Sequence, residues 1–130
     1  MYEKRLIELA LKAREKAYCP YSNFAVGAAL LCQDGTIYTG CNIESSAYTP
    51  TICAERTAVS KAVSEGHRDF VRIVIAGRSK DFCVPCGVCR QVLREFAPEL
   101  EIICLNGAGE ERVFTLPELL PHSFGPEYLL

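Results

Sequence analysis

Two short segments of the chain combine residue types that bind metals and move protons. Residues 53–55 (CAE) supply one thiol and one carboxylate, and residues 85–89 (PCGVC) supply two more thiols. Three protein ligands on zinc leave the fourth coordination position open for water, which is the arrangement of a catalytic site rather than a structural one. A carboxylate two residues from one ligand is free to take the proton of that water. The spacing therefore predicts a catalytic zinc site whose ligands are Cys53, Cys86 and Cys89, with Glu55 handling the proton.

Two other uses of these cysteines are open from the residues alone. Cys83 could complete a closed, four-thiolate structural zinc site, although Glu55 would then have no role and Pro85 interrupts the run. An iron–sulfur cluster on the cysteines of residues 83–89 is less favoured. The ferredoxin run continues to a fourth cysteine followed by proline, whereas this chain continues with Arg-Gln.

Length and composition favour one domain over residues 1–130. Hydrophobic residues make up 49% of the chain, which is enough for a buried core, and the net charge is −2. Lysine and arginine are scattered, so no basic stripe indicates a nucleic-acid partner. No apolar run is as long as a membrane span, and the N-terminal residues lack a secretory pattern. We therefore expect a cytoplasmic protein without nucleic-acid or membrane partners, in which the eight cysteines serve metal binding and packing rather than disulfides.

Hydrophobic periodicity and turn residues predict an alternation of helices and strands. Helices are expected over residues 3–17, 53–65 and 87–96, with a short one after a capping box from Thr115 to Glu118. Strands are expected over residues 25–32, 36–41, 71–76, 101–105 and 112–115. The first two strands should form a hairpin, and those on either side of the helix over 87–96 should be parallel. This order predicts an α/β fold, a three-layer α-β-α sandwich around a five-stranded mixed sheet.

The predicted helices begin at the predicted ligands. Cys53 opens one helix, and Cys86 and Cys89 open the next and share one of its faces. The free N–H groups and the dipole of a helix N-terminus stabilise a thiolate, which is the form that zinc binds. We therefore expect the two N-termini to point at each other across the strand ends, where open α/β sheets bind ligands.

Two arginines directly follow residues of these motifs. Three thiolates carry more charge than one zinc ion balances, which opposes the ionisation of a bound water. Arg56 and Arg90 could each donate a hydrogen bond to a ligand sulfur and offset the excess charge. Because arginine is mostly exposed in proteins, a surface position is the simpler alternative for either one.

Segments beyond the metal motifs are more distinctive. A ligand, one residue and a glutamate, followed by Pro-Cys-x-x-Cys, is shared by many zinc-dependent deaminases. Residues 42–44 (NIE) and 123–126 (SFGP) are typical of the enzymes that act on free nucleosides. With these segments the chain closely resembles, nearly end to end, the small homotetrameric cytidine deaminases of the three-cysteine type. Its departures, at Val84 and in residues 49–51, leave the ligands and Glu55 in place.

The resemblance implies a reaction. It is the hydrolytic deamination of cytidine and 2'-deoxycytidine to uridine and 2'-deoxyuridine, with release of ammonia, as in pyrimidine salvage. One zinc ion per subunit would lower the pKa of its water. Glu55 would pass the proton of that water to the ring nitrogen and then protonate the leaving amine.

The resemblance also implies how the nucleoside is held. Asn42 and Glu44 are implied to bind the ribose, and Ala54 to contact the pyrimidine through its backbone. Phe24 is implied to pack against the ligand, although phenylalanine is as often a core residue. Phe124 is implied to reach a neighbouring subunit's pocket, so that the homotetramer has inter-subunit active sites.

Two further functions compete with this one. A related deaminase could act on a modified nucleoside or on cytosine in nucleic acid, but the Asn42 and Glu44 pair favours a complete ribose and the near-neutral charge disfavours a polynucleotide. A non-enzymatic zinc module with Cys83 as fourth ligand is the other, and an activity measurement separates it from an enzyme.

Overall fold

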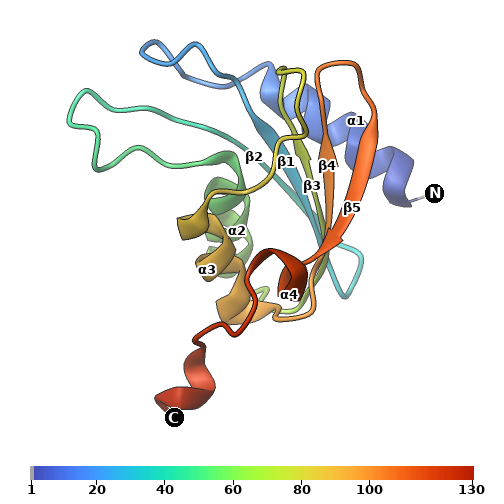
Figure 1. The fold of residues 1–130 in the computed structure, drawn as a ribbon, viewed down its shortest axis with the longest axis vertical. Helices are drawn as coiled ribbons and strands as arrows, with labels where there is room; N and C mark the ends of the chain where they lie inside the picture. The colour runs from blue at the N-terminus through green and yellow to red at the C-terminus, as the bar shows by residue number, and fades with distance from the viewer. Residues whose placement is uncertain (1) are drawn as a thin grey trace.

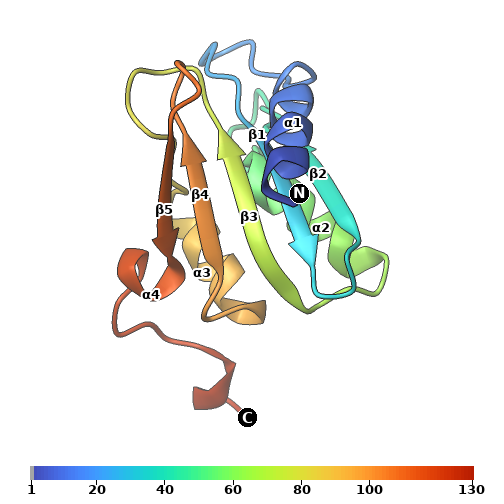
Figure 2. The same cartoon turned by 90° about the vertical axis from the view of Figure 1, so that its right-hand side faces the viewer.

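A single sheet separates one helix on one face from a group of helices on the other in the computed structural model, which describes residues 2–130 (Figures 1 and 2). The chain runs in the order α1 (Tyr2–Arg14), β1 (Gly27–Cys32), β2 (Ile37–Cys41), α2 (Ala54–Ser64), β3 (Phe70–Ala76), α3 (Gly87–Phe96), β4 (Glu101–Leu105), β5 (Glu111–Thr115), α4 (Leu116–Leu119) and the 3-10 helix η1 (Pro126–Tyr128). Helix α1 covers one face, while α2 and α3 cover the other (Figure 1). The predicted three-layer α-β-α architecture is confirmed.

The sheet is mixed, as predicted. Its strand order is β2-β1-β3-β4-β5. Strand β1 pairs antiparallel with both β2 and β3, β3 pairs parallel with β4, and β4 pairs antiparallel with β5. The parallel pair is the one joined through α3, because only a crossover helix can return the chain to the same end of the sheet.

The predicted boundaries differ from the observed ones at two places near the site. The first helix ends at Arg14 rather than Ala17, because the chain tightens into a turn in which the amide of Ala17 bonds to the carbonyl of Arg14. The first strand begins at Gly27 rather than Ala25, because the side chain of Asn42, rather than a neighbouring strand, bonds the amide of Val26.

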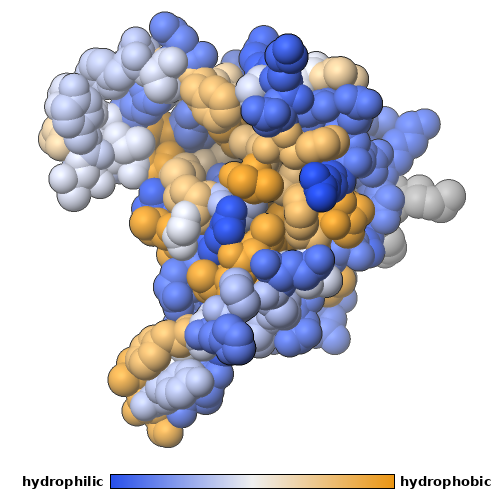
Figure 3. Space-filling model, in the orientation of Figure 1, coloured by the Kyte–Doolittle hydropathy of each residue, from blue (hydrophilic) through white to orange (hydrophobic). Residues whose placement is uncertain are grey.

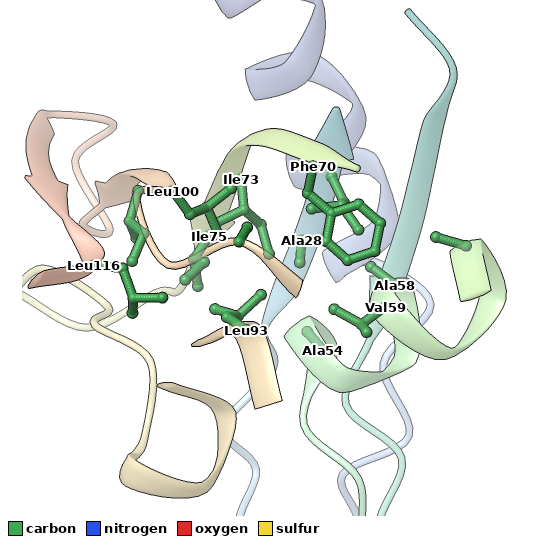
Figure 4. Packing of buried hydrophobic residues seen from close by; sticks show 14 of the residues in the cluster. Ala28, Ala54, Ala58, Val59, Phe70, Ile73, Ile75, Leu93, Leu100 and Leu116 are labelled. Carbon is green, nitrogen blue, oxygen red and sulfur yellow. The ribbon is translucent and has the colours of Figure 1, made fainter. Parts of the chain in front are cut away.

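Alternating side chains of the central strand fill a core on each face. Ile73 and Ile75 of β3 point toward α2 and α3, where they pack with Leu93 of α3 (Figure 4). Val74 points the other way, toward Leu6 of α1. Full burial of each such side chain stabilises the fold by about 1.5–3 kcal/mol. No helix in the described part of the chain is long and apolar enough to cross a membrane.

Candidate active site

The three predicted ligand cysteines meet in space. Cys53 is the N-cap of α2, Cys86 is the N-cap of α3, and Cys89 lies in the first turn of α3. Their three sulfur atoms all lie within 4.8 Å of one another. Among the side chains of the described residues, these three cysteines form a group that is compact enough to hold a metal ion. The expectation that the two helix N-termini converge is therefore confirmed.

The spacing of the sulfurs fits a zinc ion. Tetrahedral zinc with Zn–S bonds of about 2.3 Å requires neighbouring sulfurs about 3.8 Å apart. The Sγ atoms of Cys53 and Cys86 lie 3.8 Å apart. Cys53, Cys86 and Cys89 would hold the ion through their thiolates, and three ligands leave one tetrahedral position for a further oxygen.

The electrostatics of the sulfurs explain why a cation suits this place. A hydrogen bond from Cys89, helped by one from Arg56, lowers the pKa of Cys53 to about 5. The pKa of Cys89 is raised, because its proton is held against the Cys53 sulfur and because the thiol is buried. Three adjacent thiolates would repel one another, so a divalent cation is what allows all of them to ionise together.

Glu55 lies in the first turn of α2 and is almost completely buried, with 4% of its surface exposed. Burial, with a smaller contribution from the charge of Cys53, raises the pKa of its carboxyl group to about 7. It is not part of the three-sulfur group. A buried carboxyl that titrates near neutrality, beside a metal site but outside its ligand set, is suited to accept and return a proton.

The start of α2 is fixed against strand β2. A Cβ atom at Gly40 would lie 2.5 Å from the carbonyl oxygen of Ala54, so glycine is what lets the helix approach the strand this closely. The hydroxyl of Thr57 donates to the carbonyl of Cys41, at 3.0 Å, and to that of Cys53, at 3.2 Å. These contacts with β2 fix the position of the first turn of α2, which carries Cys53 and Glu55.

The two arginines have different partners. Arg56 donates from Nη2 to the Sγ of Cys53 at 3.5 Å, as expected for an arginine that offsets thiolate charge. The expectation of the same contact for Arg90 is wrong for this structure. Arg90 donates to the carbonyls of Pro85 and Leu119, both at 2.7 Å, because its side chain leaves α3 on the face that meets those two segments. It therefore holds the Cys86 turn against the end of α4.

Cys83 stands beside the metal group but not in it. Its sulfur is absent from the cluster that Cys53, Cys86 and Cys89 form among residues 2–130. Burial, with smaller contributions from the charges of Glu55 and Cys53, raises the pKa of the Cys83 thiol to about 12. The position of the Cys83 sulfur outside the three-sulfur group favours an open site with three thiolates over a closed four-thiolate site.

The two expected ribose-binding residues tie the loop before β1 to the segment after β2. The side-chain amide of Asn42 donates from Nδ2 to the backbone carbonyl of Phe24, at 2.7 Å. Its Oδ1 accepts a hydrogen bond from the backbone amide of Val26, at 2.9 Å. The carboxylate of Glu44 accepts from the amides of Tyr21 and Ser22 at 3.0 and 3.2 Å, and from the Ser22 hydroxyl. Hydrogen bonding to the Ser22 hydroxyl lowers the pKa of Glu44.

Of the three residues expected to contact the base or pack against the ligand, Ala54 and Phe24 lie in the segments that flank the site, whereas Phe124 does not. Ala54 lies between Cys53 and Glu55 in the chain and is fully buried, and the half-exposed Phe24 is bound to the side chain of Asn42 through its backbone carbonyl. Phe124 lies elsewhere, in the C-terminal segment that leaves the body of the domain (Figure 1). Its ring is 54% exposed and stacks on Tyr128 with centroids 5.1 Å apart. Its carbonyl accepts from the side chain of Gln91, at 2.9 Å.

Sequence reasoning missed two residues that organise this region. Ser22 holds the Glu44 carboxylate with both its amide and its hydroxyl. Gln91 anchors the C-terminal segment to α3. Both pairs are more than twenty residues apart in the chain, and neither periodicity nor capping rules connect them. The only signal was that their partners, Glu44 and Phe124, lie in the distinctive segments 42–44 and 123–126.

Comparison with known proteins places the chain in a family of deaminases. It matches the family described as "Cytidine and deoxycytidylate deaminase zinc-binding region" over residues 1–105, which is most of the chain. The protein belongs to this family. The match contains the converging cysteines and Glu55, so the family description and the geometry of the site agree on zinc.

Individual relatives are similar along nearly their whole length. A cytidine deaminase of Sporosarcina psychrophila is 50% identical over 127 residues, covering 97% of this chain and 93% of that protein. A crystal structure of cytidine deaminase from Burkholderia pseudomallei has a TM-score of 0.92 at 46% identity and covers 95% of this chain and 100% of that one. The crystal structure of cytidine deaminase from Mycobacterium tuberculosis has a TM-score of 0.83 at 38% identity, with 96% and 98% coverage.

Proposed function

We propose that this protein is a zinc-dependent cytidine deaminase that converts cytidine and 2'-deoxycytidine to the uridines and releases ammonia. One observation carries the proposal. Three sulfurs lie within 4.8 Å of one another, and the nearly buried Glu55 sits two residues from one of them without joining the group. Such a site offers a metal with an open position and a separate proton carrier, which are the two requirements of hydrolytic deamination.

The chain's own residues account for the proton movements. Cys53, Cys86 and Cys89 would hold a zinc ion through their thiolates, and this ion would supply a Lewis acid that lowers the pKa of a water. The Glu55 carboxylate takes one proton of the attacking water and transfers it to the ring nitrogen of the pyrimidine. It then takes the remaining proton from the hydroxyl group added to the ring and delivers it to the leaving amine, which departs as ammonia. Because the pKa of Glu55 is raised to about 7 by burial, neither taking nor giving the proton is strongly uphill at neutral pH.

The nucleoside is held by the loop that precedes β1 and the segment that follows β2. Asn42 and Glu44 offer amide and carboxylate groups to the ribose hydroxyls. In the structure these groups bond to the backbone of Phe24 and of Ser22, so the same contacts that order the loop set the spacing of the ribose-binding groups. Phe24 forms the wall of the pocket, and the backbone of Ala54 borders the pyrimidine.

The active unit in this proposal is a cytoplasmic homotetramer, involved in pyrimidine salvage, in which Phe124 enters a neighbouring subunit's pocket. Large hydrophobic side chains are exposed on the loops and helix starts around the site and on the C-terminal segment, namely Tyr21, Phe24, Tyr48, Val84, Val88 and Phe124. Exposed large apolar side chains of this kind are typical of residues that become buried between subunits. The space-filling view has hydrophobic side chains in the recess between the projecting loop after β2 and the C-terminal segment (Figure 3).

A direct assay tests the proposal. Purified, zinc-loaded protein is incubated with cytidine, 2'-deoxycytidine, free cytosine and a cytosine-containing oligonucleotide, and uridine and ammonia are quantified. Turnover of both nucleosides, with little of the base or the oligonucleotide, supports it. A zinc-loaded tetramer that deaminates neither nucleoside would contradict it and would favour a non-enzymatic zinc module.

A further inference from the structure

Cys83 is a buried thiol beside the active site that the proposed reaction does not use. It lies in the loop from Gly77 to Pro85, between β3 and α3, and it packs against the core under α2 and α3. It belongs neither to the sulfur group of Cys53 nor to the proton path of Glu55. Its position, rather than its reactivity, is the property that requires an explanation.

Cys83 occupies the space that a side chain at Gly77 would need. A Cβ atom built at Gly77 would lie 2.9 Å from the Cβ of Cys83, 3.0 Å from its Sγ and 3.8 Å from the Cζ of Phe24. Favourable contacts between carbon atoms begin at about 3.5 Å. The absence of a side chain at Gly77 therefore lets Cys83 and the ring of Phe24 lie against the same stretch of backbone.

This stretch of backbone is fixed from several sides. Arg14, at the end of α1, donates from Nη1 to the carbonyl of Gly77, at 2.7 Å. The amide of Cys83 donates to the carbonyl of Leu105 in β4, at 3.1 Å. A clash between Gly77 and Cys83 is therefore expensive to relieve by moving the main chain. The partly exposed ring of Phe24 is the neighbour with room to move.

We propose that Gly77 and Cys83 are positioning residues that set where the ring of Phe24 stands at the wall of the nucleoside pocket. This inference rests on the proposed function, in which Phe24 packs against the substrate. A methyl group at Gly77 would displace the Cys83 side chain, and a larger side chain at Cys83 would need the space over Gly77. Either change crowds the ring of Phe24, which already contacts the Gly77 position, and we infer that the ring moves toward the pocket. Substrate binding then suffers, while the three sulfurs and Glu55, which are carried by the helix N-termini, keep their arrangement.

Two substitutions approach this contact from opposite sides. Gly77→Ala and Cys83→Val are compared with the wild type by zinc content and by steady-state kinetics with cytidine. We expect KM to rise about tenfold in each, which is the effect of one misplaced methyl group in a tight pocket, with one zinc per chain and kcat within about twofold. Cys32→Val is the matched control, because it makes the same change at a buried thiol at the far end of β1, and its KM should equal that of the wild type.

Rescue distinguishes positioning from general damage. In Gly77→Ala/Cys83→Gly, the second substitution removes the Cβ and Sγ atoms with which the new methyl group would clash. The KM of this double variant should therefore fall back to within about threefold of the wild type. If Gly77→Ala does not fold, Cys83→Val and its control carry the test. Folded variants with unchanged KM, or a loss confined to kcat, would overturn the inference. An inactive wild type would instead refute the proposed function.

Discussion

Arg56 and Cys53 are joined by a hydrogen bond from the guanidinium Nη2 to the ligand sulfur, at 3.5 Å. The bond runs within the first turn of α2, from a residue three positions after the ligand. It places a fixed positive charge beside the Cys53 sulfur, whose pKa is lowered to about 5 mainly by a hydrogen bond from Cys89. The charge of three thiolates on one zinc ion is thus balanced within a single helical turn.

Removing this charge should weaken zinc binding. In Arg56→Ala the sulfur of Cys53 loses its donor, and we expect the zinc affinity to fall about 10- to 100-fold, as for other partners of metal ligands. Competition with a chromogenic chelator measures it. Arg68→Ala, an exposed arginine beyond the end of α2, is the control. An affinity equal to the wild type in Arg56→Ala would show that the bond has no role in holding the metal.

The zinc site should need three cysteines and not a fourth. Cys89→Ser should lose zinc during dialysis against a mild chelator, because a buried hydroxyl replaces a thiolate ligand. Cys83→Ser should keep one zinc per chain, because its sulfur lies outside the group. Metal analysis of both dialysed proteins checks this. Loss of zinc from Cys83→Ser would mean that the site is closed by four thiolates.

Complete active sites should require two subunits. Phe124→Ala should raise KM for cytidine by about tenfold or more, because a large apolar contact to the ligand is lost. Glu55→Gln and Phe124→Ala chains, each carrying a different tag, are then co-expressed, and hybrid tetramers are isolated. Hybrids contain sites with Glu55 from one chain and Phe124 from another, so their KM should include a wild-type component. If the hybrids show only the kinetics of the Glu55→Gln and Phe124→Ala homotetramers, without a component of wild-type KM, each active site is formed by a single chain.

The C-terminal segment that carries Phe124 should loosen in acid. Its Glu127 forms an ion pair with Arg94 of α3, and this contact lowers the pKa of Glu127. A depressed carboxyl pKa stabilises the attached state above the ordinary value of about 4.3, and the stabilisation is lost as the pH falls through the lowered pKa. Amide hydrogen exchange of residues 123–130, corrected for intrinsic rates, should rise between pH 6 and pH 3.

The same experiment has a built-in control. In Arg94→Gln the ion pair is absent at every pH, so the segment should exchange rapidly throughout and lose most of its pH dependence. Exchange in the wild type that does not change with pH would show that the ion pair does not hold the segment.

Local rules were enough to predict the metal centre from the sequence. Helix N-termini, the i to i+3 spacing of Cys86 and Cys89, and the unused carboxylate of Glu55 are all properties of short stretches. The order of helices and strands also followed from periodicity, and α3 and β4 have the predicted bounds. These features depend on few residues, so tertiary structure had little opportunity to override them.

Contacts between distant segments could not be predicted in this way. Arg90 and Arg56 look alike in sequence, but Arg90 is drawn to the carbonyl of Leu119, twenty-nine residues away. The side chain of Asn42 bonds to Phe24, eighteen residues away, and to Val26, sixteen residues away, and the second bond moves the start of β1 to Gly27. Which partner a long side chain chooses depends on the packing of whole elements, and that information is absent from any local pattern.

The most direct test of the central claim compares the wild type with Glu55→Gln and with Glu65→Gln, the same change at the exposed end of α2. Zinc content and turnover of cytidine are measured on the same preparations. We predict one zinc per chain in all three, normal turnover in Glu65→Gln, and a loss of about 10²- to 10⁴-fold in Glu55→Gln, because the buried amide takes no proton from water. A zinc-loaded Glu55→Gln enzyme with near-normal turnover would contradict the assignment of Glu55 as the proton carrier.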